Sequence, residues 1–188
     1  MTNSLQVLDD QLQGLRINFH WHQDRFAHSI GFANEERFVP LLASHEGSKT
    51  DPWPHSPPLQ DLSELPSASG QRSILLVGRA GRSHWSASVE TSLSPLAIHL
   101  DIACRLYEIP QILCSSYRTM TVPVISSAGQ VAVEIDGHTA WLQADLLPGA
   151  QSRWEITAEG CALRTMPISP DTPQTVRWKY RVTVANSP

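Results

Sequence analysis

Apolar and polar residues alternate along most of this chain, and this alternation constrains the fold more than any other feature. In the segment TVRWKYRVTV, residues 175–184, every second residue is valine, tryptophan or tyrosine. A period of two is typical of a β-strand with one buried face. Similar segments recur between clusters of Gly, Pro, Ser and Asp. They predict strands at residues 14–22, 25–33, 37–45, 72–79, 83–91, 96–107, 112–122, 130–135, 138–146, 152–158 and 175–185, with another near 161–166.

Many short strands with short connections predict an all-β fold with antiparallel sheets. Asp136-Gly137, between two alternating segments, is a strong hairpin signal. A length of 188 residues favours a single domain, residues 1–188. Because consecutive strands usually pair, we expect a meander that forms a closed or partly closed β-barrel. Such a barrel is lipocalin-like in outline only, and a two-sheet β-sandwich is the alternative fold.

One long segment, residues 46–71, lacks the alternation and is rich in proline and serine. We interpret it as an excursion within the domain, anchored by Trp53. Within it, residues 57–65 are the best candidate for a short helix in the chain.

Composition excludes several classes of protein. The chain is 41% hydrophobic and 17% charged, as expected for a globular domain, and its formal net charge is −4. The absence of a basic cluster argues against nucleic-acid binding, and no apolar run is long enough to span a membrane. The N-terminus lacks the pattern of a secretory signal. Three cysteines without metal-binding spacing favour a reduced, cytoplasmic protein with free thiols.

The segment NFHWHQDRFAH, residues 18–28, concentrates three histidines and an arginine. We predict a hairpin that turns at Gln23 and Asp24. The predicted pairs are Leu15 with Phe32, Ile17 with Ile30, Asn18 with Ser29, Phe19 with His28, His20 with Ala27, Trp21 with Phe26 and His22 with Arg25. This register places His28 on the apolar face and His20 and His22 on the opposite face. The three histidines therefore cannot bind one metal ion together unless a bulge intervenes.

His20 and His22 remain as a candidate metal-binding pair. Two histidines on one face can hold zinc, nickel or iron when a third ligand comes from elsewhere. The pair alone is a weak motif, and the neighbouring Arg25 would repel a cation. A solvent-exposed polar face on an edge hairpin is the simpler interpretation.

A second polar cluster is predicted on the strands at 83–91 and 96–107. If these strands form a hairpin, Ser86 and Ser88 lie beside His99 and Asp101, with His84 one position further along. The candidate ligand-binding residues are His84, Ser86, His99, Asp101, Arg105 and Tyr107. Arg105 could bind a carboxylate or phosphate through two hydrogen bonds. A serine in the middle of a strand lacks the sharp turn and oxyanion donors of a hydrolase nucleophile.

These features lead to three functional hypotheses. The first is a non-enzymatic protein that binds a small polar or anionic ligand through the second cluster. The second is a metal-dependent enzyme that uses His20 and His22. The third is a structural or protein-interaction module that self-associates through a strand edge or Trp53. On the strand at 175–185, we interpret Arg177, Lys179 and Arg181 as charges that discourage edge-to-edge aggregation. The sequence identifies no cofactor.

Overall fold

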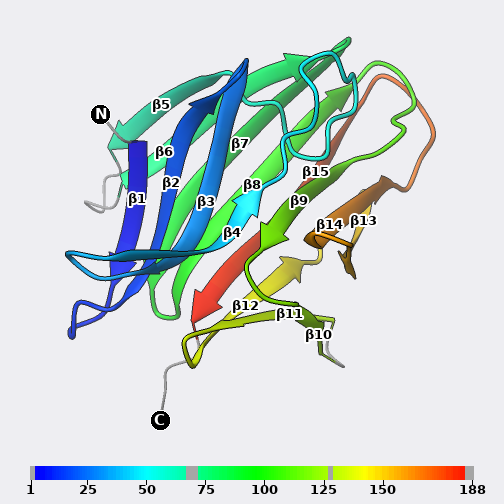
Figure 1. The fold of residues 1–188 in the computed structure, drawn as a ribbon. Coiled ribbons are helices and arrows are strands. Elements are labelled where there is room, and N and C mark those ends of the chain that lie inside the picture. Colours follow the sequence, from blue (N-terminus) through cyan, green and yellow to red (C-terminus); the bar gives the residue numbers. More distant parts are fainter. Residues whose placement is uncertain (1–2, 67–71, 127–128, 185–188) are drawn as a thin grey trace.

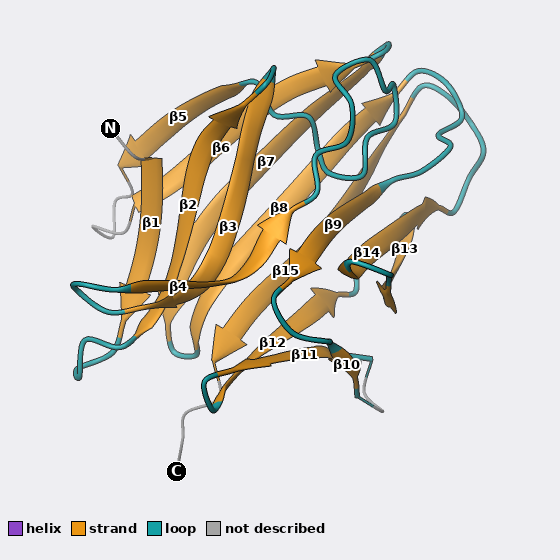
Figure 2. Cartoon of the chain, viewed as in Figure 1, coloured by secondary structure: helices purple, strands orange, loops and turns teal. Residues whose placement is uncertain are grey.

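The computed structural model describes residues 3–66, 72–126 and 129–184, and within these ranges the chain forms fifteen β-strands and no helix (Figures 1 and 2). The predicted all-β class is therefore confirmed. The first eight strands are β1 (Asn3–Leu8), β2 (Gly14–His22), β3 (Arg25–Ala33), β4 (Phe38–Ser44), β5 (Asp61–Pro66), β6 (Arg72–Ala80), β7 (Ser83–Leu93) and β8 (Leu96–Leu106). The others are β9 (Cys114–Thr119), β10 (Val124–Ile125), β11 (Val131–Ile135), β12 (His138–Asp145), β13 (Ala150–Ile156), β14 (Gly160–Pro167) and β15 (Gln174–Val184).

The strands form two antiparallel sheets that face each other, as Figure 1 shows. Sheet A has the order β1-β2-β3-β4-β9-β14-β13, and sheet B has the order β10-β11-β12-β15-β8-β7-β6-β5. No hydrogen-bonded ladder joins the two sheets among the described residues. The sheets are therefore not closed into a barrel, so the barrel and its lipocalin-like outline are not confirmed and the sandwich-like alternative fits. The reason is that the chain repeatedly crosses between sheets, first from β4 to β5 and later from β8 to β9, instead of pairing each strand with the one before.

The hydrophobic core lies between the sheets, because the alternation gives each sheet one apolar face. Sheet A contributes Leu15 and Ile17, which are fully buried. Sheet B contributes Trp178 of β15 and Trp85 of β7, whose rings meet edge to face with centroids 5.9 Å apart.

Local pairing follows the sequence closely in the first hairpin. All seven predicted pairs between β2 and β3 are present, including Phe19 with His28 and His22 with Arg25. The predicted Asp136-Gly137 turn connects β11 to β12. Both residues have positive φ, 51° and 77°, as the tight turn of a hairpin requires.

Three sequence interpretations are corrected by the sheet order. Residues 61–66 form the edge strand β5, which pairs with β6, so the helix expected at 57–65 is absent. The hairpin of β2 and β3 is not at an edge, because β1 and β4 flank it. Strand β15 lies in the centre of sheet B, between β12 and β8, so its basic side chains do not protect an edge. Strands β1 and β10 were not predicted.

The predicted excursion is irregular only as far as residue 60, and residues 67–71 lie outside the described ranges. We call residues 45–60 the strap, because this segment crosses one end of the sandwich near the β6–β7 turn (Figure 1). Trp53 is buried in the core, as its predicted anchoring role requires. The strap is also tied to both sheets: Leu59 O accepts a hydrogen bond from Phe26 N at 2.7 Å, and Gln60 N donates to Val77 O at 2.8 Å.

Candidate functional site

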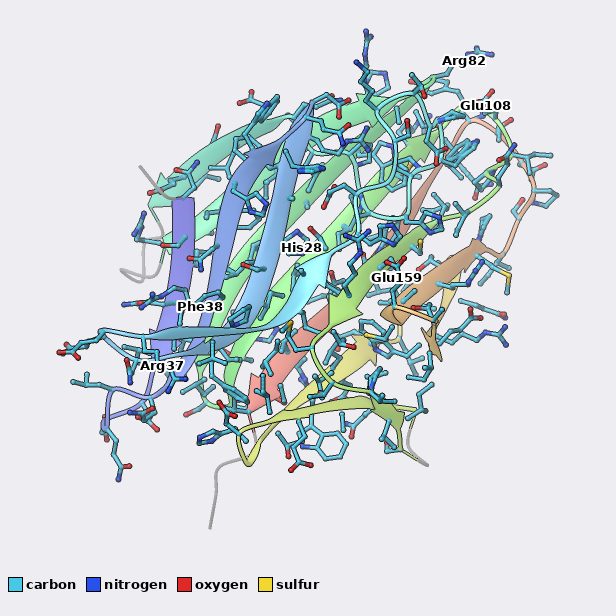
Figure 3. The ribbon with its side chains drawn as sticks, in the orientation of Figure 1. His28, Arg37, Phe38, Arg82, Glu108 and Glu159 are labelled. Carbon is cyan, nitrogen blue, oxygen red and sulfur yellow. The ribbon has the colours of Figure 1, made fainter. Side chains whose placement is uncertain are left out.

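The end of the sandwich opposite the strap contains the larger of two adjoining hollows. Figure 3 labels Arg37 and Phe38 at this end and Arg82 and Glu108 at the strap end. The larger hollow has a volume of about 890 Å³ and is open to solvent. Its walls come from the β1–β2 turn, the end of β3, the β7–β8 turn, the start of β12 and the end of β15. Both sheets therefore contribute to it.

The lining of this hollow combines an apolar floor with a polar rim. Phe32, Ala33, Leu96 and Val184 supply apolar surface, and Ala33 and Leu96 are largely buried. The rim carries Asp9, Asp10, Gln11, Gln13, Ser94 and His138. An apolar surface with a few polar groups around it is typical of a small-molecule site.

A smaller hollow of about 120 Å³ adjoins the first and shares Gln13, Phe32, Ala33 and His138 with it. The rings of Phe32 and His138 lie 5.1 Å apart, centroid to centroid, with their planes at 53°. This aromatic pair belongs to β3 of sheet A and β12 of sheet B. It therefore joins the two sheets at the point where the two hollows meet.

Within the β1–β2 turn, the side chain of Asp9 is hydrogen-bonded to the backbone. Its Oδ1 accepts hydrogen bonds from the amides of Gln11 and Gln13, at 2.9 and 3.0 Å. Asp9 therefore shapes the rim, while the exposed side chains of Asp10, Gln11 and Gln13 are placed around the mouth.

The six predicted ligand-binding residues lie elsewhere, on the outer face of sheet B and its margin. His84 is opposite Arg105 across the β7–β8 pair, and Ser86 is opposite Ala103. Ser88 is opposite Asp101, within the predicted register, but His99 faces Glu90 instead of a serine. None of the six lines either hollow.

Several of these six side chains are occupied by protein partners. Arg177 of β15 donates to Asp101 through both Nε, at 2.6 Å, and Nη2. His99 Nε2 lies 2.9 Å from Ser92 Oγ. The Arg105 guanidinium carbon is 6.0 Å from the Tyr107 ring centroid, and the His84 ring is also 6.0 Å from that ring. The structure thus separates a small group of His84, Arg105 and Tyr107 from an Asp101–Arg177 ion pair.

His20 and His22 are exposed side chains on the outer face of sheet A, opposite Ala27 and Arg25. In the described part of the chain, no group of three histidine, cysteine or acidic residues is arranged to hold a metal ion. Arg25 is only 2% exposed and donates to Asp24 Oδ1 at 2.9 Å. The burial of this arginine was not predicted, because the strap that covers it is distant in sequence.

A buried polar chain crosses the core between the sheets. His28 Nε2 on β3 lies 2.9 Å from Tyr117 Oη on β9, which lies 2.6 Å from Tyr180 Oη on β15. Trp178 Nε1 donates to Ser115 Oγ at 3.0 Å. Figure 3 labels His28 among the side chains of the central strands. The predicted position of His28 on the apolar face is confirmed, and its ring has a buried hydrogen-bond partner in Tyr117.

Burial sets the ionisation of this chain. It lowers the pKa of His28 to about 4, with a smaller effect from the charge of His20. It raises the pKa of Tyr180 to about 12 and raises that of Tyr117 as well. All three groups are therefore neutral at pH 7. None of them lines either of the hollows at the open end.

The cysteines Cys104, Cys114 and Cys161 are free and buried. Burial raises the pKa of each thiol to about 12. Thiolate chemistry at neutral pH is therefore suppressed at all three.

Sequence reasoning missed the open-end hollows because they are assembled from turns and strand ends distant in sequence. The sequence did hold a partial signal for a strand followed by a turn, because Asp9 and Asp10 come just after the alternating apolar residues Leu5 and Val7. Nothing local to that segment indicated that it would face His138.

The sequence matches no known family model and no curated protein at a significant level. The class that the geometry defines is a two-sheet antiparallel β-sandwich with a strap at one end and a mixed apolar and polar hollow at the other. Across residues 3–66, 72–126 and 129–184, no helix is long and apolar enough to cross a membrane.

Proposed function

We propose that this protein binds a small molecule in the open-end hollow. The observation that supports the proposal best is the hollow itself, about 890 Å³, with Phe32, Ala33 and Leu96 on its floor and polar side chains at its mouth. This volume is within the range of known ligand pockets. The proposed activity is binding without catalysis, in a reduced, cytoplasmic setting that is consistent with the free thiols.

The charge of the rim favours some ligands over others. The two hollows are lined by three carboxylates, Asp9, Asp10 and Asp136, and by one arginine, Arg37. An anionic ligand would be repelled at this rim, so a neutral polar ligand with an apolar portion fits this site better than the anion considered from sequence.

The outer face of sheet B is a second candidate, and it suits the anionic alternative. Arg105 is exposed, its Nη1 donates to Thr175 Oγ1 at 3.3 Å, and Tyr107 and His84 lie beside it. An arginine beside two rings can contact a carboxylate or phosphate. This candidate lacks an enclosing hollow, so we rank it second.

Fragment screening by NMR distinguishes the two sites. The probes are sets of neutral, cationic and anionic fragments, and the readout is which residues shift. We expect neutral fragments to move the signals of Phe32, Ala33 and His138. Gln13→Trp should abolish these shifts by filling the hollow from an exposed position, whereas Arg105→Ala, the matched control, should leave them unchanged.

Two results would count against the open-end site. Shifts confined to the neighbourhood of Arg105 that persist in Gln13→Trp would move the site to sheet B. No saturable shift from any fragment set would remove the binding proposal.

A further inference from the structure

The strap is held over the end of the sandwich by contacts that meet near its start. The Arg25 guanidinium donates to the carbonyl oxygens of Glu46 and Ser48, at 3.4 and 3.5 Å. His45 N donates to Ser116 O at 2.9 Å, and Ser116 N donates to His55 O at 3.1 Å. The strap thereby takes the place of a neighbouring strand along β9 where β4 has ended.

Glu46 contributes a buried carboxyl group to this fastening, beside the buried guanidinium of Arg25. Its side chain is only 6% exposed. Its Oε1 is hydrogen-bonded by Ser44 Oγ, which also accepts a hydrogen bond from His28 N at 2.8 Å. Its Oε2 is buried and has no hydrogen-bond partner among the described residues. A buried carboxylate oxygen without a donor is costly, whereas a neutral carboxyl is tolerated.

The charges that face Glu46 do not neutralise it. Arg25 lies nearby, but its guanidinium is paired with Asp24, at 2.9 Å between Nε and Oδ1. The negative charge of Asp24 raises the pKa of Glu46, whereas the positive charge of Lys49 lowers the pKa of Asp24. Glu46 also acts on the pKa of Tyr117 of β9, whose hydroxyl is neutral. Burial outweighs the favourable effects of Ser44 and Arg25 and raises the pKa of Glu46 to about 7.

We propose that the strap is a pH-sensitive cover, held closed while Glu46 is neutral and loosened when its carboxyl loses a proton. Loosening moves the charged carboxylate into water, breaks the Arg25 contacts with the strap backbone and uncovers the edge of β9 at Ser116. This inference is independent of the ligand proposed for the opposite end.

Lysine-specific proteolysis tests the cover directly, because the chain has only two lysines, Lys49 in the strap and Lys179 in β15. Lys49 is exposed, but a protease needs several residues around it in extended form, so cleavage follows opening of the strap. A carboxyl whose pKa falls from about 7 when closed to 4.5 when open makes opening about tenfold more favourable at pH 8 than at pH 6.

The comparison uses wild type, Glu46→Gln and the matched control Glu36→Gln, whose glutamate is exposed in the β3–β4 turn. Between pH 6 and 8, the rate of cleavage at Lys49 should rise about tenfold more in wild type and in Glu36→Gln than in Glu46→Gln. The protease's own pH dependence is the same for all three proteins, so it cancels in this comparison. Parallel profiles in all three proteins would overturn the proposal.

A second measurement covers the case in which Glu46→Gln does not fold. Hydrogen exchange of wild type, corrected for the intrinsic effect of pH, should accelerate in residues 45–60 but not in the central strand β15 between pH 6 and 8. Equal protection of the strap at both pH values would also overturn the proposal.

Discussion

The hydroxyl groups of Tyr117 and Tyr180 lie 2.6 Å apart and form a buried hydrogen bond between the two sheets. Tyr117 belongs to sheet A and Tyr180 to sheet B. His28 extends this contact on the side of sheet A. The core of the sandwich is therefore fixed by a polar contact as well as by apolar packing.

Removing the central hydroxyl should destabilise the protein. Tyr117→Phe leaves His28 Nε2 and Tyr180 Oη without their buried partner, so we expect a loss of about 1–3 kcal/mol in the free energy of unfolding. Urea denaturation measures it. The control is Tyr107→Phe at an exposed position, which should change stability by less than about 0.5 kcal/mol. Equal effects of the two substitutions would show that the Tyr117 hydroxyl contributes nothing special.

Glu46 and His28 should give opposite dependences of stability on pH. The pKa of Glu46 is raised from 4.5 to about 7, so its contribution is present below pH 4.5 and is lost as pH rises through 7. The pKa of His28 is lowered from 6.5 to about 4, so its contribution is present above pH 6.5 and is lost as pH falls through 4. In wild type, these two slopes oppose each other between pH 4.5 and 6.5.

In Glu46→Gln, the pH dependence of the free energy of unfolding should come mainly from His28. Relative to wild type, this variant should gain up to about 3 kcal/mol in the free energy of unfolding between pH 4.5 and 8, since each pKa unit corresponds to about 1.4 kcal/mol. Denaturation curves over this pH range provide the measurement. A constant difference between variant and wild type at every pH would show that Glu46 titrates normally.

Gly78 should tolerate no side chain, because the strap passes directly over it. A Cβ added at this position would lie 1.9 Å from Pro58 O, and that oxygen belongs to backbone that cannot move aside cheaply. We expect Gly78→Ala to lower the melting temperature by several degrees and to increase exchange in residues 45–60. The control is Gly129→Ala, where the added Cβ would meet no atom within 4 Å, although its φ of 73° also imposes strain. A fully protected strap in Gly78→Ala would contradict this packing.

The Asp101–Arg177 pair should contribute little to stability. Arg177 is 58% exposed, and exposed ion pairs are weak because water and salt screen them. We expect Asp101→Asn to change the free energy of unfolding by less than about 1 kcal/mol and to leave fragment binding at the open end unaltered. Thermal denaturation and the same NMR titration measure both effects. Loss of fragment binding in this variant would show that Asp101 contributes to the ligand site.

Local geometry was accessible from the sequence, whereas the relation between the sheets was not. The pairing of Phe19 with His28 follows from alternation and from one short turn, and seven of the nine pairs of that hairpin were predicted. Barrel and sandwich share such hairpins and differ in how distant strands pair. Strand β4, for example, pairs with β9 after two further hairpins have been placed in sheet B, and no local signal encodes that choice.

The prediction of candidate sites was limited for the same reason, because their contacts join segments that are distant in sequence. Asp101 and Arg105 were correctly assigned to one polar face. Asp101, however, forms an ion pair with Arg177, which lies on a strand more than 70 residues away in sequence. The open-end hollow is made of turns and strand ends that the sequence placed only in part, because β1 and its turn into β2 were not predicted. Burial of Glu46 depends on the strap folding back over Arg25, which alternation does not predict.

The central claim is that the open end of the sandwich holds a ligand, and a crystal structure with a bound fragment tests it most directly. A neutral fragment with an apolar portion, chosen from the NMR titration, should appear in the hollow against Phe32 and His138, with its polar group near Gln13. The same fragment found only beside Arg105, or side chains filling the open end, would contradict the account.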